Sequence, residues 1–157
     1  ARVESRDYEG SIGSRLSMWQ TAWSIFQEHP MVGVGPHKFR AEFVRRMKSG
    51  ETPRADADHN QPHNDILNAA ATGGGLKLMA YLFLIGAPLM FFCKQYKATK
   101  LDIDKRMFPI MGIQVVGAFF ITGLTNSNFD LQIYSTTYAV LVCVLAKLSV
   151  VSEAPTA

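Results

Sequence analysis

The sequence predicts an all-α fragment of a polytopic membrane protein, in which a helical segment outside the membrane precedes three transmembrane helices. Three apolar runs occupy residues 76–93, 107–125 and 131–151. A helix of about 18 residues covers about 27 Å, close to the roughly 30 Å hydrocarbon thickness of a bilayer. Lys77 and Lys147, near the ends of their runs, are the only Asp, Glu, Lys or Arg residues in them. Residues 1–75, in contrast, carry nine Lys or Arg and nine Asp or Glu.

Charge and cysteine usage narrow the class of protein. The formal net charge of +3 comes entirely from residues 76–157, so no basic face is expected for nucleic acid. Cys93 and Cys143 lie inside apolar runs, and we expect small core residues rather than a disulfide or metal pair. The chain starts at Ala1 without an initiator Met or a signal-peptide pattern, so we expect the C-terminal part of a larger protein.

A first helix is predicted over residues 14–28, after a polar loop at 1–13. Ser14 suits the N-cap and Pro30 ends the helix. Apolar residues recur at helical spacing, namely Leu16, Trp19, Trp23 and Phe26. We expect the aromatic residues to pack in a core, and the alternative is that they line a path for a lipid or a sugar.

Arg15 is a candidate functional residue of this helix. It lies four residues before Trp19 and therefore projects from the same face. In the first turn a cation opposes the helix dipole by about 0.3–1 kcal/mol. A helix selected only for stability would more often carry an acid there.

A second short helix is predicted over residues 39–48, with Phe39, Phe43 and Met47 on one face. It follows a glycine turn at 33–36, which is not a dinucleotide loop because Lys38 stands where the third glycine belongs. The basic residues of this helix are expected to form a solvated face rather than a phosphate contact: Arg40, Arg45, Arg46 and Lys48.

The short loops predict the orientation of the spans. The loop 94–106 is rich in Lys and Arg and should be cytoplasmic, whereas the turn 126–130 has none and should face outward. Residues 1–75 would then lie outside, which in a bacterium is the periplasm. Residues 56–75, nearest the first span, contain no Lys or Arg and do not oppose this orientation.

The densest polar cluster, residues 58–65, lies just before the first span. His59 and His63 are four apart, but Pro62 between them makes a shared helical metal site weak. We expect a helix from Pro62 to Thr72, separated from the span by the glycine break 73–75. His63 in its first turn would be neutral, as a general base requires, and Asp65 or Asn64 could orient it.

The chain carries a set of motifs in a fixed order: Gly13-Ser14-Arg15, Trp19, Ala22, Phe26, His29-Pro30, Gly33-Val34-Gly35-Pro36 and Pro62-His63-Asn64-Asp65-Ile66-Leu67 before the glycine break. This combination resembles the O-antigen ligase and polymerase superfamily, in motif over residues 10–95 and in architecture over the two later spans. The resemblance implies a bacterial inner-membrane glycosyltransferase with one large periplasmic loop. Such proteins move a glycan from an undecaprenyl-diphosphate carrier onto an acceptor hydroxyl.

The resemblance also assigns roles to residues. The family's periplasmic-loop arginine falls on Arg15 and its essential histidine on His63. Arg15 would hold the diphosphate and His63 would take the acceptor proton. Asn64, Asp65, His59 and Arg40 are further substrate-binding candidates. Neither cofactor nor metal is implied, since the carrier diphosphate supplies the driving force.

Lipid A core is the expected acceptor, as in the ligase branch. An O-antigen polymerase, a protein O-oligosaccharyltransferase, or a non-catalytic transporter or scaffold fragment are the alternatives. The chain departs from the family pattern at Lys77, where a second glycine is usual. It also lacks the upstream region that carries a further family arginine, so these residues alone are expected to be inactive.

Overall fold

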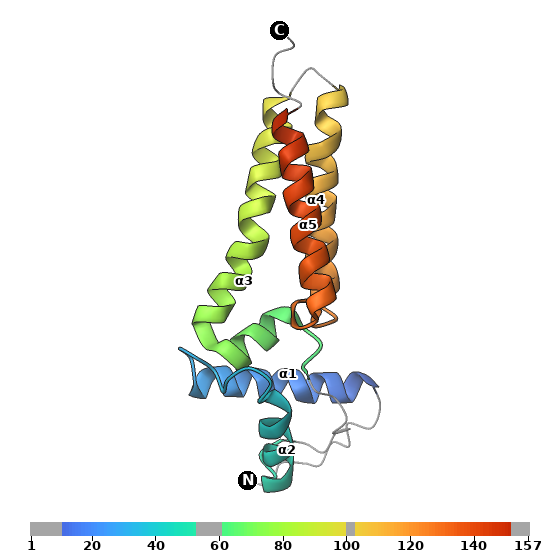
Figure 1. The fold of residues 1–157 in the computed structure, drawn as a ribbon. Helices are drawn as coiled ribbons and strands as arrows, with labels where there is room; N and C mark the ends of the chain where they lie inside the picture. The colour runs from blue at the N-terminus through green and yellow to red at the C-terminus, as the bar shows by residue number, and fades with distance from the viewer. Residues whose placement is uncertain (1–10, 53–60, 100–102, 152–157) are drawn as a thin grey trace. The chain divides into compact units, whose positions relative to one another are not determined.

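The structure is a computed structural model that describes residues 11–52, 61–99 and 103–151. Over these ranges it is helical and contains no strand, which confirms the all-α prediction. The helices are α1 (Ser11–Glu28), α2 (Phe39–Ser49), α3 (Asp65–Ala98), α4 (Ile103–Gly123) and α5 (Gln132–Val151), with a short 3₁₀ helix, η1 (Asn128–Asp130), before α5 (Figure 1).

The chain divides into two compact units. The first contains residues up to Tyr81 together with Leu124–Ser127, and the second contains Leu82–Gly123 and the residues from Asn128 onward. The first unit therefore holds α1, α2 and the beginning of α3. The second holds the remaining length of the apolar helices.

Three helices, α3, α4 and α5, are long and apolar enough to cross a membrane, which confirms the three predicted spans. The charged loop predicted at 94–106 is wrong in extent, because α3 continues to Ala98 and α4 begins at Ile103. Lys97 lies in the last turn of α3, where the negative end of the helix dipole favours a cation. Arg106 of α4 donates to the Thr99 carbonyl at 2.9 Å and lies 5.1 Å from the centre of the Tyr96 ring. These charges stabilise helix ends instead of forming a loop.

Aromatic packing joins the helices of the second unit. The Tyr138 ring of α5 is buried, and its hydroxyl donates to the Leu84 carbonyl of α3 at 2.8 Å. Its centroid lies 5.1 Å from that of Phe119 and 5.2 Å from that of Phe129. Many other large apolar side chains on these helices are exposed, as expected for surfaces that face lipid. Cys143 is among the exposed residues, so the expectation that it packs in a core is wrong.

In the first unit, α1 buries a different face from the predicted one. Met18, Ala22 and Ile25 enter a core that also contains Phe39, Phe43 and Ala71. Leu16 and Trp23, which belong to the predicted apolar face, are exposed. Small hydroxyl residues occupy the rest of the buried face, and Thr21 satisfies its hydroxyl by donating to the Ser17 carbonyl at 2.9 Å. Hydrophobicity alone therefore selects the wrong face.

The two glycine segments noted in the sequence pack against each other. Gly74 has φ 62 and ψ −156 and kinks α3, which frees the carbonyls of Ala71 and Thr72. These carbonyls accept hydrogen bonds from Val34 N at 2.9 Å and from Gly35 N at 3.0 Å. In exchange, Gly75 N donates to the Pro30 carbonyl at 2.7 Å. At the kink, backbone hydrogen bonds to the turn that follows α1 therefore replace hydrogen bonds within α3. The backbone N–H and C=O groups at the kink thus keep hydrogen-bond partners.

Glycine is required on both sides of this contact. A Cβ at Gly33 would overlap the backbone of residues 71–73, and a Cβ at Gly74 would overlap the backbone of Met31 and Val32. Both glycines also have positive φ, a conformation that residues with a Cβ rarely adopt. The glycine turn at 33–36 and the glycine break at 73–75 therefore form one close backbone contact, which is called the backbone crossing below.

Candidate functional site

His63 lies outside α3, which corrects the predicted helix start at Pro62. Its φ of 49 is left-handed, and the helix begins two residues later at Asp65. The side chain is half-buried. His63 therefore precedes the cap of α3 instead of occupying its first turn.

Asn64 is the residue that caps α3. Its side-chain oxygen accepts from Leu67 N at 3.0 Å, as an N-cap asparagine should. Its side-chain nitrogen donates to the Leu124 carbonyl at 3.0 Å, within the same unit. The left-handed residue therefore bends the chain directly before the capped helix.

A hydrogen bond links the helix that carries Arg15 to the segment that carries His63. The Trp19 indole N–H donates to the Pro62 carbonyl at 2.8 Å. Trp19 is one helical turn after Arg15 on the same face, and Pro62 immediately precedes His63. The structure thus brings together two parts of the chain that the sequence separates by more than forty residues.

Arg15 itself lies in the second turn of α1, because the helix begins at Ser11 rather than at Ser14. The predicted conflict with the helix dipole is therefore reduced, since that effect fades beyond the first turn. Arg15 is exposed.

The other sequence candidates are placed differently. Asp65 is buried at the start of α3, where the positive helix end favours an acid. Arg40 lies exposed in the first turn of α2, and His59 lies outside the described residues. Within 11–52, 61–99 and 103–151, no three His, Cys, Asp or Glu side chains form a group that could hold a metal ion.

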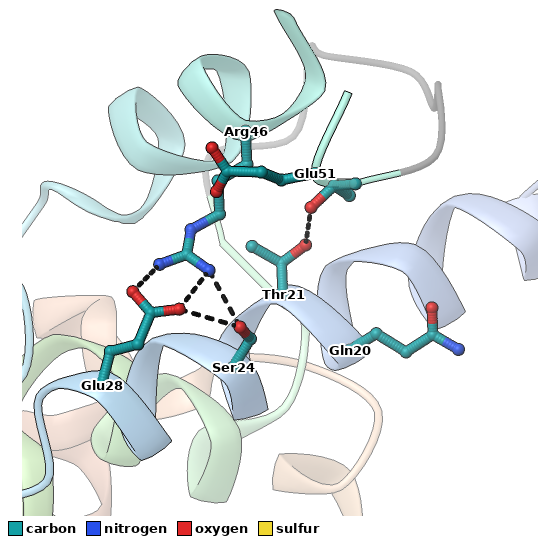
Figure 2. Close-up of a pocket in the computed structure, with 7 residues that line it drawn as sticks. Gln20, Thr21, Ser24, Glu28, Arg46 and Glu51 are labelled. Atoms are coloured by element: carbon teal, nitrogen blue, oxygen red, sulfur yellow. Dashed lines mark hydrogen bonds and ion pairs between the residues drawn. The ribbon is translucent and has the colours of Figure 1, made fainter. Parts of the chain in front are cut away.

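Arg46 contradicts the prediction that the basic residues of α2 are all solvated. Its side chain is only 4% exposed. Its Nη2 donates to Glu28 of α1 at 2.6 Å, its Nε to Glu42 at 2.7 Å and its Nη1 to Ser24 at 2.9 Å. The bonds from Arg46 to Glu28 and Ser24, drawn in Figure 2, connect α2 to the end of α1.

A polar cavity of about 440 Å³ opens beside this network. Its lining comes from α1, from α2 and from two residues of the segment after α2: Gln20, Thr21, Ser24, Glu28, Arg46, Glu51 and Thr52 (Figure 2). The Thr21 and Thr52 hydroxyls lie 3.1 Å apart and bond to each other. Much of the lining is therefore already paired within the protein.

The arginines keep the neighbouring carboxylates ionised. Hydrogen bonds from Arg45 and Arg46 lower the pKa of Glu42 to about 2, against the cost of its partial burial. The hydrogen bond from Arg46 likewise lowers the pKa of Glu28. Sequence reasoning missed this network because Glu28 is 18 residues from Arg46, although Glu42 at i−4 gave a partial signal.

The chain has three helices that are long and apolar enough to span a membrane, and the first of them begins within the first unit. This arrangement defines a multi-pass membrane protein. The sequence profile of the O-antigen ligase family matches residues 1–83, more than half of the chain, and the chain belongs to that family. An uncharacterized protein from Haemophilus influenzae is 23% identical over 111 residues, which are 71% of this chain and 27% of that relative. The chain thus spans about a quarter of the length of this relative. The family is one of glycosyltransferase-like enzymes.

Proposed function

We propose that the full-length protein is a metal-independent glycosyltransferase of the bacterial inner membrane. It transfers an O-antigen-type glycan from undecaprenyl diphosphate to an acceptor hydroxyl, with lipid A core as the acceptor. The family membership and the three spans support the general class. The Trp19–Pro62 hydrogen bond is the single observation that carries the site, because it links the arginine helix to the histidine segment.

The chemistry assigns one step to each residue. His63 accepts the proton of the acceptor hydroxyl as the oxygen attacks the anomeric carbon of the glycan. The bond from that carbon to the carrier diphosphate breaks, and the diphosphate leaves with the bonding electron pair. Arg15 binds the departing diphosphate, for which its planar fork suits two phosphate oxygens at once. The exposure of Arg15 leaves room for this ligand.

The orientation and the further contacts belong to the same proposal. Residues 1–75 lie in the periplasm, and the connection between α3 and α4 lies in the cytoplasm. Asn64 and Asp65 orient His63, and Arg40 and His59 contact the glycan donor. Asn64 supports this role through its cap, since both polar atoms of its side chain are engaged.

The test of the base replaces His63 by Asn in the full-length protein. Asn tolerates a left-handed backbone comparatively well, so the turn should survive while the base is lost. We expect transfer from a purified carrier-linked donor to fall by about a hundred- to ten-thousand-fold. The matched control is His37→Asn, since His37 is also left-handed, with φ 61, and exposed. Transfer by His63→Asn at the wild-type rate would contradict the assignment of His63 as the base. Loss of transfer by the wild-type protein in EDTA would contradict the metal-independent mechanism.

The same assay tests Arg15 and the acceptor. Arg15→Lys keeps the charge but loses the two-point fork, so transfer should fall well beyond the roughly fivefold effect of an exposed ion pair. Arg45→Lys, at another exposed arginine, should retain transfer. Glycan added to lipid A core supports the ligase assignment, whereas chains extended only on the carrier or added to protein identify a polymerase or a protein glycosyltransferase.

A further inference from the structure

α1 carries a second apolar face that its own unit leaves partly uncovered. The residues in line are Ile12, Leu16, Trp19, Trp23 and Phe26, which follow the i, i+4, i+7, i+11, i+14 spacing of a single helical stripe. Ile12 is 85% exposed, Trp23 52% and Leu16 42%, while Trp19 and Phe26 are partly buried. The core residues Met18, Ala22 and Ile25 lie on another side of the helix. An apolar stripe with three exposed and two partly buried residues marks an interaction surface.

The stripe continues toward the start of the first membrane span. Beyond the end of α1, Met31 and Val32 are 76% and 68% exposed. Their segment is bonded to α3, because Gly75 N donates to the Pro30 carbonyl at 2.7 Å. Leu76 and Met79, in the next turn of α3, are exposed apolar residues of the same unit. The end of α1 is therefore fixed to the point where α3 becomes a membrane helix.

We propose that this stripe docks on the lipid–water interface of the membrane that α3 crosses. The partner is the bilayer surface, because the stripe is continuous with a helix that already meets lipid. α1 itself is not one of the spans, and a helix with one apolar and one polar exposed side lies along an interface rather than through it. Tryptophan favours that level of the bilayer, where its ring is in apolar surroundings and its N–H has polar partners.

This docking places Arg15 at a defined depth in the membrane. Arg15 lies three residues after Ile12 and four before Trp19, and so borders the stripe. With the stripe in the interface, its guanidinium lies at the level of lipid phosphates. Only this consequence for the carrier diphosphate rests on the proposed function; the docking itself rests on the spans and the exposed stripe.

The test uses the full-length protein in phospholipid nanodiscs, with its native cysteines replaced. Leu16→Cys and Trp23→Cys report on the stripe, and Lys48→Cys, at an exposed polar position of α2 in the same unit, is the control. Each cysteine carries a nitroxide, and power saturation measures its collisions with O₂, which enters lipid, and with a Ni(II) chelate, which stays in water. We expect O₂ to dominate at 16 and 23 and the chelate to dominate at 48.

Two results would overturn the proposal. If the chelate dominates at 16 and 23, the stripe faces water. If both reagents collide rarely there and the spectra are immobilised, another protein segment covers the stripe. Ile12→Cys gives the same reading if Trp23→Cys does not yield folded protein. None of these readings depends on glycan transfer, so they are independent of the outcome for the enzyme.

Discussion

His63 adopts a left-handed backbone, which non-glycine residues seldom do and which costs about 1–3 kcal/mol when it is imposed. Such conformations persist where the surroundings enforce them, and they cluster at functional sites. His37 is also left-handed, so the conformation alone does not single out the base. His63 differs because the cap of α3 follows it and the Trp19 hydrogen bond precedes it.

Arg46 provides a test of stability at the scale of one residue. Arg46→Met removes a buried guanidinium that bonds Glu28, Glu42 and Ser24. Glu28 is half exposed, so water replaces part of the lost interaction, and we expect a loss of about 1–3 kcal/mol in the stability of the α1–α2 pairing. Pulse proteolysis of the full-length protein measures this loss.

The matched control for Arg46 is its neighbour Arg45. Arg45 forms ion pairs with Glu42 and Glu51 at the solvent-exposed surface, where ion pairs contribute little to stability. Arg45→Met should therefore leave the protease resistance of α1 and α2 close to that of the wild type. Equal sensitivity of the two variants would show that burial of Arg46 does not stabilise the pairing.

Single residues show what the sequence could and could not predict. Arg15 and His63 were recognisable as candidates by residue type and by position within a motif. The hydrogen bond that joins their segments was not, because Trp19 looked like a core residue and Pro62 like a helix start. The ion pair between Arg46 and Glu28 was not predictable either, because these residues meet only after α1 and α2 have packed together.

At the scale of elements, the positions of the apolar helices were predictable, but the buried face of α1 was not. Length and hydropathy suffice for a span, since lipid demands only a long apolar helix with internal hydrogen bonds. α1 has two faces that can leave water, and its core face uses small residues such as Ala22 and Ser17. The sequence identified the more hydrophobic face, of which Leu16 and Trp23 remain exposed.

The backbone crossing of the two glycine segments is the element-level feature most open to test. Gly74→Ala would place a Cβ against the backbone of Met31 and Val32 at a positive φ. We expect a cost of at least about 1–3 kcal/mol from the backbone conformation, with steric overlap added. A lower apparent melting temperature of the purified full-length protein in detergent is the readout.

The control for Gly74 is another glycine of the same helix. A Cβ at Gly86 meets no described atom within 4 Å, and alanine there favours helix by about 0.5–1 kcal/mol. Gly86→Ala should therefore melt at or slightly above the wild-type temperature. If Gly74→Ala melts no lower than Gly86→Ala, the crossing does not stabilise the first unit.

At the scale of the whole molecule, the sequence predicted the all-α class and three spans because a bilayer leaves few alternatives. It did not predict that Leu124–Ser127, between α4 and η1, packs with the first unit. That contact includes the hydrogen bond from the Asn64 side chain to the Leu124 carbonyl. Hydropathy carries no information about such a hydrogen bond.

The orientation of the molecule in the membrane is the last prediction, and labelling of single cysteines tests it. In a cysteine-free full-length protein, Glu51→Cys and Thr125→Cys should react with a membrane-impermeant maleimide added to intact cells. Lys97→Cys should react only after the inner membrane is opened, because positive charge near spans is retained on the cytoplasmic side. All three positions are exposed, so accessibility within the protein does not distinguish them. Reaction of Lys97→Cys in intact cells, with protection of the other two, would invert the topology and place His63 on the side opposite to the proposed periplasmic site.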